Sequence, residues 1–209
     1  SLDSERAARL VNVFVAQARA RLAGHAPANM VLLRGFSRLP HLPPMAEVYR
    51  LNPAAIATYP MYRGLAKLLG MKVLPTGSTI EEEFATLAQH YAEHDFFFVH
   101  IKKTDAAGED GDFAAKVAVL EEIDSLLPRL TELEPEVLVV TGDHSTPTAL
   151  KGHSWHPVPL VLYSKWCRPD RVRQFTEAAC AGGALGRFPA TEVMALAMAN
   201  ALKLEKFGA

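Results

Sequence analysis

The chain has 209 residues, of which 49% are hydrophobic and 22% charged, a composition that can bury one sizeable core and a smaller second one. Its formal net charge of -1 and pI near 6.7 give no general attraction to nucleic acid or anionic lipid, so we expect a small-molecule substrate. The chain shows no signal-peptide pattern, no metal-spaced cysteine pair and no apolar run near the ~20 residues of a membrane span, which together predict a cytoplasmic protein.

The first part of the chain is predicted to contain one amphipathic helix and an irregular segment. Apolar side chains recur at helical spacing from Ser4 to Leu22, which predicts a helix over that range. The apolar run from Met30 to Leu33 predicts a short buried strand that ends at Arg34. Several prolines between residues 37 and 53 exclude long regular structure, so we expect a domain boundary at about residue 50.

Beyond that boundary, predicted strands and helices alternate, which is typical of an α/β fold with an open, mostly parallel sheet and helices on both faces. Apolar runs predict strands at residues 54–57, 72–74, 96–101, 137–140 and 158–163. Helical spacing and capping signals predict helices at residues 61–69, 79–93, 113–127, 169–181 and 191–204. Pro128 is expected to stop one of these helices, and residues 102–112 are expected to form a loop.

Polar clusters lie where predicted strands end or begin. They cover residues 102–112, 141–147 and 151–156. Ligands of open α/β sheets bind beyond the carboxyl ends of the strands, and carboxylates with imidazoles converging there suit a divalent cation. One acidic, glycine-rich turn is more often a solvated surface, but three clusters in register with strand ends favour a metal site.

Neighbouring residues permit other interpretations. Ser145 or Thr146 beside His144 is an alternative hydrolase nucleophile, although no third orienting carboxylate and no Gly-x-Ser-x-Gly turn supports it. His100, inside a predicted strand, is expected to be a hydrogen-bonded core group or a partner of a ligand rather than a ligand.

The clusters together resemble the metal-binding end of archaeal-type cofactor-independent phosphoglycerate mutases. The resemblance rests on Thr-Gly-Asp-His-Ser-Thr at residues 141–146, Lys-x-His-Ser at 151–154, Pro-Val-Pro at 157–159 and the stretch at 100–112. The run at residues 30–35 and the closing residues 203–208 are similar as well. The resemblance implies a partial alkaline phosphatase-like fold and an isomerase that interconverts 3-phosphoglycerate and 2-phosphoglycerate in glycolysis and gluconeogenesis.

The same resemblance implies a site for two divalent ions. Carried over by motif, Asp143 and His144 bind one ion, and Asp105, Glu109 and His153 bind the other. The family ordinarily has a histidine at the position of Glu109. Because the carboxylate adds charge and a harder oxygen donor, manganese is expected first, with magnesium or zinc as alternatives.

The family's phosphoryl-accepting serine and its first metal-binding aspartate have no counterpart in residues 1–24. The resemblance therefore implies that both lie outside this chain and that this chain alone is inactive. Residues 1–50 would be the distal part of an inserted substrate domain, and residues 51–209 the returning half of the phosphatase-like domain. Basic residues bind the family's substrate, and the candidates here are Arg34, Arg63 and Lys151.

Two alternatives stay open. Another phosphatase or phosphomutase of the same superfamily would keep the metal-binding residues and differ in its substrate domain. A non-catalytic chain would keep the fold and a metal ion for stability alone. Motifs at the metals do not separate these alternatives, and the sequence does not specify an oligomeric state.

Overall fold

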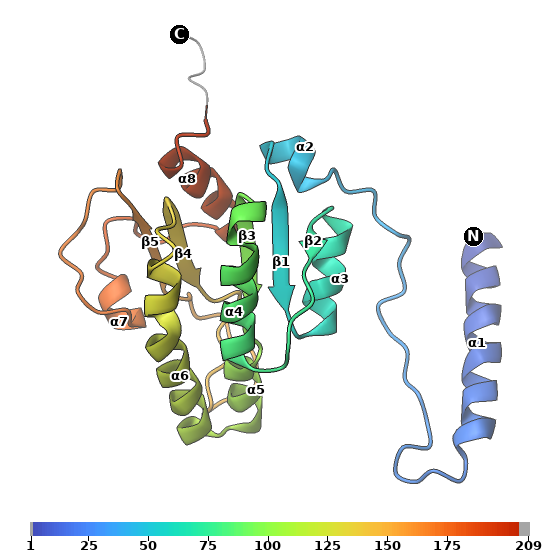
Figure 1. Ribbon diagram of the computed structural model, residues 1–209. Coiled ribbons are helices and arrows are strands. Elements are labelled where there is room, and N and C mark those ends of the chain that lie inside the picture. Colours follow the sequence, from blue (N-terminus) through green and yellow to red (C-terminus); the bar gives the residue numbers. More distant parts are fainter. Residues whose placement is uncertain (1, 205–209) are drawn as a thin grey trace. The chain divides into compact units, whose positions relative to one another are not determined.

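The computed structural model describes residues 2–204 and divides between His41 and Leu42 into two compact units. The first contains helix α1 (Leu2–Leu22) and an extended segment (Figure 1). The strand predicted at residues 30–33 is wrong. This segment pairs with no other part of residues 2–204 and therefore belongs to no sheet. Residues 205–208, part of the closing stretch compared above, lie outside the described residues.

The second unit is built around a parallel three-stranded sheet in the order β2-β1-β3. β1 (Pro53–Ala57) pairs with β2 (Lys72–Val73) at one edge and with β3 (Phe96–His100) at the other. All five residues of β1 are buried, which requires a cover on both faces of the sheet. The predicted α/β fold with a parallel sheet is confirmed.

Helices supply that cover. The described helices of this unit are α2 (Met45–Tyr49), α3 (Pro60–Leu68), α4 (Ile80–His90), α5 (Lys103–Asp110), α6 (Phe113–Thr131), α7 (Glu177–Cys180) and α8 (Val193–Asn200), with 3-10 turns at Tyr91–Glu93 and Ala190–Glu192. Ile56 of β1 belongs to one cluster with Leu87 of α4 and Leu130 of α6. Its neighbour Ala55 belongs to another with Ala66 of α3 and Met198 of α8, so these helices lie on opposite faces.

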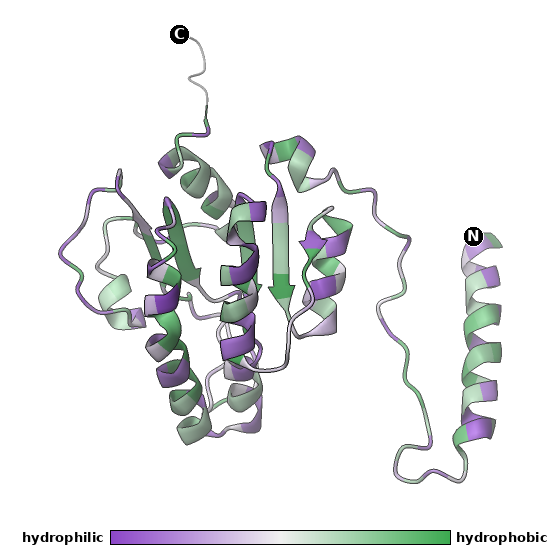
Figure 2. Ribbon diagram, in the orientation of Figure 1, coloured by the Kyte–Doolittle hydropathy of each residue, from purple (hydrophilic) through white to green (hydrophobic). Residues whose placement is uncertain are grey.

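The last strands, β4 (Val137–Thr141) and β5 (Leu160–Ser164), form a separate antiparallel pair of largely hydrophobic residues (Figure 2). Within residues 2–204, β4 forms no ladder with β3, so each of these strands has one unpaired edge. All of β3 is only partly buried, unlike β1. The strand predicted at residues 158–163 begins later, at Leu160. It also pairs antiparallel with β4 and does not extend the parallel sheet.

Pro128 does not stop the helix in which it lies. α6 continues to Thr131, although proline removes one backbone hydrogen bond. Leu126 packs against Phe84, and Leu130 packs against two core clusters. This burial on both sides of Pro128 outweighs the lost hydrogen bond, which sequence spacing alone did not indicate.

The helix predicted at residues 169–181 is also wrong over most of its length, because only α7 forms. Asp170 accepts hydrogen bonds from the backbone N–H groups of Val172 at 2.8 Å and Ala184 at 2.8 Å. These local bonds stabilise turns that compete with a helix. None of the helices within residues 2–204 combines the length and apolar character that crossing a membrane requires.

Candidate metal centre

α5 carries two predicted ligands on one face. Residues 102–112 were expected to form a loop, but Lys103–Asp110 is helical, and Asp105 and Glu109 are one turn apart. The helix ends at Gly111, whose φ of 74° is a left-handed conformation that glycine adopts without strain. A rigid element directly after β3 thus positions both carboxylates.

The loop after β4 packs closely on α5. A Cβ atom at Gly108 would lie 2.4 Å from the carbonyl oxygen of Thr146, so only glycine permits this approach. The same carbonyl accepts a hydrogen bond from Lys116 Nζ at 2.6 Å. The position of Asp143 and His144, which precede Thr146 in this loop, is therefore fixed relative to α5.

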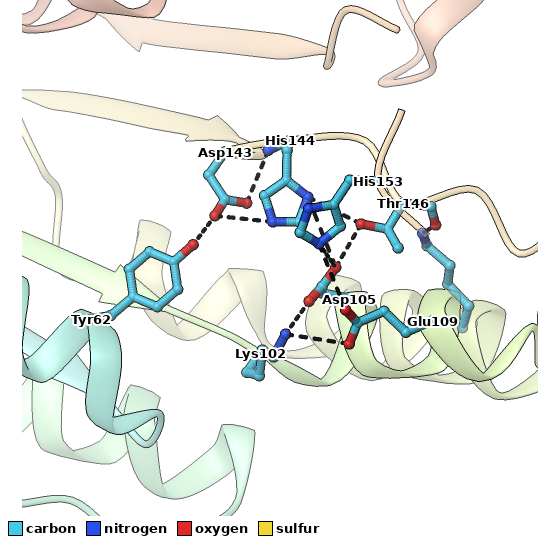
Figure 3. A network of polar contacts seen from close by, with 9 residues as sticks. Tyr62, Lys102, Asp105, Glu109, Asp143, His144, Thr146 and His153 are labelled. Carbon is cyan, nitrogen blue, oxygen red and sulfur yellow. Dashed lines mark hydrogen bonds and ion pairs between the residues drawn. The ribbon is translucent and has the colours of Figure 1, made fainter. Parts of the chain in front are cut away.

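The structure brings all five predicted metal ligands together beyond β3 and β4 (Figure 3). Asp105 Oδ1 lies 3.6 Å from His153 Nε2 and 3.8 Å from His144 Nδ1. Glu109 Oε1 lies 3.7 Å from His153 Nε2, and His144 Nε2 lies 3.5 Å from Asp143 Oδ2. One ligand atom from each of Asp105, His144 and His153 lies within 4.8 Å of the others. Carboxylate oxygens and imidazole nitrogens at this spacing fit a divalent cation.

Thr146 determines which nitrogen of His144 is free. Its hydroxyl donates a hydrogen bond to Asp105 Oδ1 at 2.5 Å. With that proton used, Thr146 Oγ1 accepts from His144 Nδ1, which lies 3.0 Å away. This network assigns the proton of His144 to Nδ1 and leaves the lone pair of Nε2, on the side of Asp143, to bind an ion.

Lys102 lies within this cluster, although the sequence did not mark it as a site residue. Its Nζ donates a hydrogen bond to Asp105 Oδ2 and lies 3.8 Å from Glu109 Oε2. The hydrogen bond with Asp105 raises the pKa of Lys102, so the side chain is an ammonium at neutral pH. Burial alone would raise the pKa of Asp105, but the hydrogen bonds from Lys102 and Thr146 outweigh it and keep that carboxyl ionised.

Asp143 accepts a hydrogen bond from the Tyr62 hydroxyl of α3. Burial and then this hydrogen bond raise the pKa of Tyr62, so the phenol keeps its proton. Burial would raise the pKa of Asp143 as well, but the bond from Tyr62 and the nearby His144 outweigh it and lower that pKa. The Tyr62 ring stacks on His100, with centroids 3.6 Å apart. His100 is partly buried, and its Nδ1 has no hydrogen-bond partner within residues 2–204, so the expected hydrogen-bonded core group is not confirmed.

The predicted substrate-binding residues lie in different places. The side chain of Lys151 packs over Gly111, where an added Cβ would lie 2.4 Å from Lys151 Cε, so this residue borders α5. Arg63 is exposed on α3, next to Tyr62 in the chain. Arg34 is exposed in the extended segment of the first unit.

Three residues of the site were not predicted from the sequence to have the contacts that they make. Lys102 stands three positions before Asp105, a spacing that brings side chains together once the segment is helical. That signal was lost because the segment was expected to be a loop. Thr146 was considered only as a nucleophile, and Tyr62 lies too far from Asp143 in the chain for any local pattern to connect them.

A family model described as Metalloenzyme superfamily matches residues 12–200. A relative from Thermosipho melanesiensis, named probable 2,3-bisphosphoglycerate-independent phosphoglycerate mutase, is 53% identical over 99% of this chain and 52% of its own length. A relative of the same name from Thermotoga maritima is 52% identical over 99% of this chain and 51% of its own length. The chain therefore spans about half the length of these curated relatives.

Two solved structures likewise match nearly all of this chain with only part of their own length. A Pyrococcus horikoshii protein superposes with a TM-score of 0.91 at 27% identity, covering 99% of this chain and 60% of that one. The cofactor-independent phosphoglycerate mutase of Thermoplasma acidophilum superposes with a TM-score of 0.66 at 28% identity, covering 93% of this chain and 52% of that one.

Proposed function

Because this chain belongs to the metalloenzyme superfamily, we propose that it is the metal-binding part of a cofactor-independent phosphoglycerate mutase. The complete protein would interconvert 3-phosphoglycerate and 2-phosphoglycerate as a glycolytic enzyme of the cytoplasm. The observation that carries the proposal is the convergence of Asp105, Glu109, Asp143, His144 and His153 in a chain about half identical to relatives of that name.

The five ligands divide into two groups in this proposal. Asp105, Glu109 and His153 hold one ion, which is supported by His153 Nε2 facing an oxygen of each carboxylate. Asp143 and His144 contribute to a second ion, which is supported by the hydrogen bond that engages His144 Nδ1 and leaves Nε2 toward Asp143. Manganese is the first candidate for both, with magnesium or zinc as alternatives, because oxygen donors outnumber nitrogen donors in the first group.

The bound ions would stabilise charge on the transferred phosphoryl group and lower the pKa of the nucleophile. The residues of this chain orient that centre: Thr146 holds one oxygen of Asp105, and Tyr62 holds one oxygen of Asp143. The phosphoryl-accepting serine would come from a part outside this chain. Lys151 borders the centre and is the first candidate to bind a substrate anion, and Arg63 and Arg34 remain further candidates.

The domain assignment is proposed on the same basis. Residues 1–50 would belong to an inserted substrate domain, and residues 51–209 to the phosphatase-like domain. The compact units divide between His41 and Leu42, and Met45 and Leu51 lie in a core cluster of the second unit. A short segment before residue 51 thus packs with the metal-binding part.

Assay of the full-length protein with manganese on 3-phosphoglycerate tests the proposal. We expect interconversion with 2-phosphoglycerate, abolished by Asp105→Ala and by His153→Ala, and no turnover by the 209-residue chain alone. Pentose phosphates and simple phosphate esters are the control substrates. Turnover of these without mutase activity would instead indicate another phosphomutase or phosphatase, and mutase turnover by this chain alone would show that no outside serine is needed.

A further inference from the structure

A lysine ammonium lies among the proposed ligands of the first ion. Lys102 Nζ donates a hydrogen bond to Asp105 Oδ2 and lies 3.8 Å from Glu109 Oε2. The side chains of Lys102 and Asp105 are only 26% and 14% exposed, so water screens their charges incompletely. One positive charge therefore interacts with both carboxylates of this group.

The position of Lys102 is set by the same helix that carries these carboxylates. Lys102 is the N-cap residue of α5, and its backbone cannot move away from Asp105 without unwinding the helix. The side chain has more freedom, because four rotatable carbons separate Nζ from the backbone. Nζ also lies 5.1 Å from the centroid of the Tyr59 ring, within the range of a cation–π interaction. The ammonium thus has a second favourable contact, with the Tyr59 ring.

A divalent cation held with His153 and this ammonium would share two carboxylates through different oxygens. His153 Nε2 faces Asp105 Oδ1 and Glu109 Oε1, whereas Lys102 Nζ faces Oδ2 and Oε2. An ion held by Asp105 and Glu109 would bring a double positive charge close to Nζ, and the repulsion between them is strong where water is partly excluded. This repulsion disfavours the hydrogen bond between Lys102 and Asp105 once the ion binds. The repulsion is subtracted from the free energy of ion binding.

We propose that Lys102 is a built-in competitor for the divalent cation: its ammonium neutralises Asp105 and Glu109, and repulsion moves it toward Tyr59 when an ion binds the other oxygens of these carboxylates. The inference rests on the proposed ion site of Asp105, Glu109 and His153. The ammonium limits repulsion between two carboxylates that stand one helical turn apart, at the cost of weaker ion binding. Lys102 is thus a positioning residue that sets the metal affinity of the site.

Calorimetric titration of manganese into the 209-residue chain and two variants tests this competition. Lys102→Met removes the charge and keeps the length of the side chain, so the Kd for manganese should fall on the order of tenfold. Lys103→Met is the matched control: it removes the same charge from the next residue, which is exposed and acts on Glu83 instead. The control should leave the Kd nearly unchanged.

The outcomes separate the two proposals. A Lys102→Met variant that binds manganese no more tightly than the unchanged chain overturns the competition while leaving the ion site in place. Equal tightening by Lys103→Met also overturns it, because general charge would then explain the effect. If the unchanged chain binds no manganese, the ion site itself is wrong and the inference falls with it.

A second readout needs no variant. Acetic anhydride acetylates free lysine amines, and mass spectrometry measures the rate at each position of the unchanged chain. Saturating manganese should release Lys102 from Asp105 and raise its acetylation rate several-fold, while the rate at Lys103 stays the same. A rate at Lys102 that manganese leaves unchanged or slows would contradict the proposed displacement.

Discussion

Thr146 joins the two proposed groups of metal ligands through one hydroxyl, which donates to Asp105 and accepts from His144. Thr146→Val keeps the shape of this buried side chain and removes the hydroxyl. We expect the Kd for manganese to rise about tenfold, because partners that orient metal ligands commonly contribute 10- to 100-fold in affinity. Thr146→Ser, which retains the hydroxyl, should restore most of the affinity in the same titration. Equal affinities of the Val and Ser variants would show that the hydroxyl does not orient Asp105.

Glu83 is a buried carboxyl outside the metal centre. It is only 2% exposed, and its Oε1 has no hydrogen-bond partner within residues 2–204. Burial raises the pKa of Glu83 from 4.5 to about 7, against the opposing hydrogen bonds with Thr58. Since the folded state holds the proton more tightly than the unfolded chain, the stability contributed by protonated Glu83 is complete below pH 4.5 and lost as the pH rises through 7.

Glu83→Gln tests this linkage, because glutamine stays neutral at every pH of interest. Between pH 4.5 and 8, the free energy of unfolding of the unchanged chain should fall by about 3 kcal/mol relative to that of the variant. Urea unfolding of both proteins across this range provides the measurement. Parallel pH profiles would mean that Glu83 ionises as readily in the folded protein as in the unfolded chain.

The sequence predicted the charged ligands of the site better than the groups around them. Asp105, Asp143 and His153 follow or precede apolar strands in a recognisable pattern, and the structure brings them together as expected. Tyr62 has no such signal, because its contact with Asp143 depends on how α3 packs. Lys102 has a local signal, its spacing of three residues from Asp105, but that signal applies only once the segment is known to be helical.

Among the elements, the contact between α5 and the loop after β4 is the most sensitive to a single atom. Alanine at Gly108 would force its Cβ to 2.4 Å from the Thr146 backbone carbonyl, which no side-chain rotation can relieve. Gly108→Ala should therefore destabilise the protein by roughly 1–3 kcal/mol and weaken manganese binding, despite the better helix propensity of alanine.

Gly64→Ala is the matched control for this substitution. Gly64 also lies in a helix, α3, but a Cβ there meets nothing within 4 Å. Replacing it should stabilise the protein by up to about 1 kcal/mol through helix propensity alone. Thermal unfolding of both variants distinguishes the two effects. A Gly108→Ala variant as stable as Gly64→Ala would show that the loop moves aside at no cost.

Elements with strong local signals were predicted well, and elements that depend on partners were not. The capping box of Thr79 and Glu82 opens α4 as predicted, and the apolar run at residues 96–101 forms β3. α5 has a polar sequence that contains glycine, so nothing in its pattern indicated a helix that packing on α6 stabilises. The strand predicted at residues 30–33 was wrong although its local signal was clear. An apolar run forms a strand only where a partner strand is available.

At the scale of the whole molecule, β3 and β4 each have an edge that no described strand pairs. Hydrogen exchange should detect this. Amides of β1, which pairs at both edges, should exchange slowest, while the alternate amides of β3 that point away from β1 should exchange much faster. Uniformly slow exchange along β3 would mean that its outer edge is protected in solution.

The resemblance to cofactor-independent phosphoglycerate mutases, first drawn from short motifs, is confirmed by relatives about half identical over 99% of the chain. Those relatives are about twice as long. In the proposal, the activity belongs to a longer protein, to which this chain would contribute the proposed metal ligands, the groups that orient them and the proposed competing lysine.

Calorimetric titration of manganese into this chain and into Asp105→Ala, His153→Ala and His144→Ala tests the proposed metal centre most directly. We predict about one tightly bound ion per chain, lost in the first two variants because they remove ligands of the first group. His144→Ala should have little effect, since Asp143 and His144 alone supply too few ligands to bind a second ion tightly. Tight binding that depends on His144 but not on Asp105 would contradict the assignment.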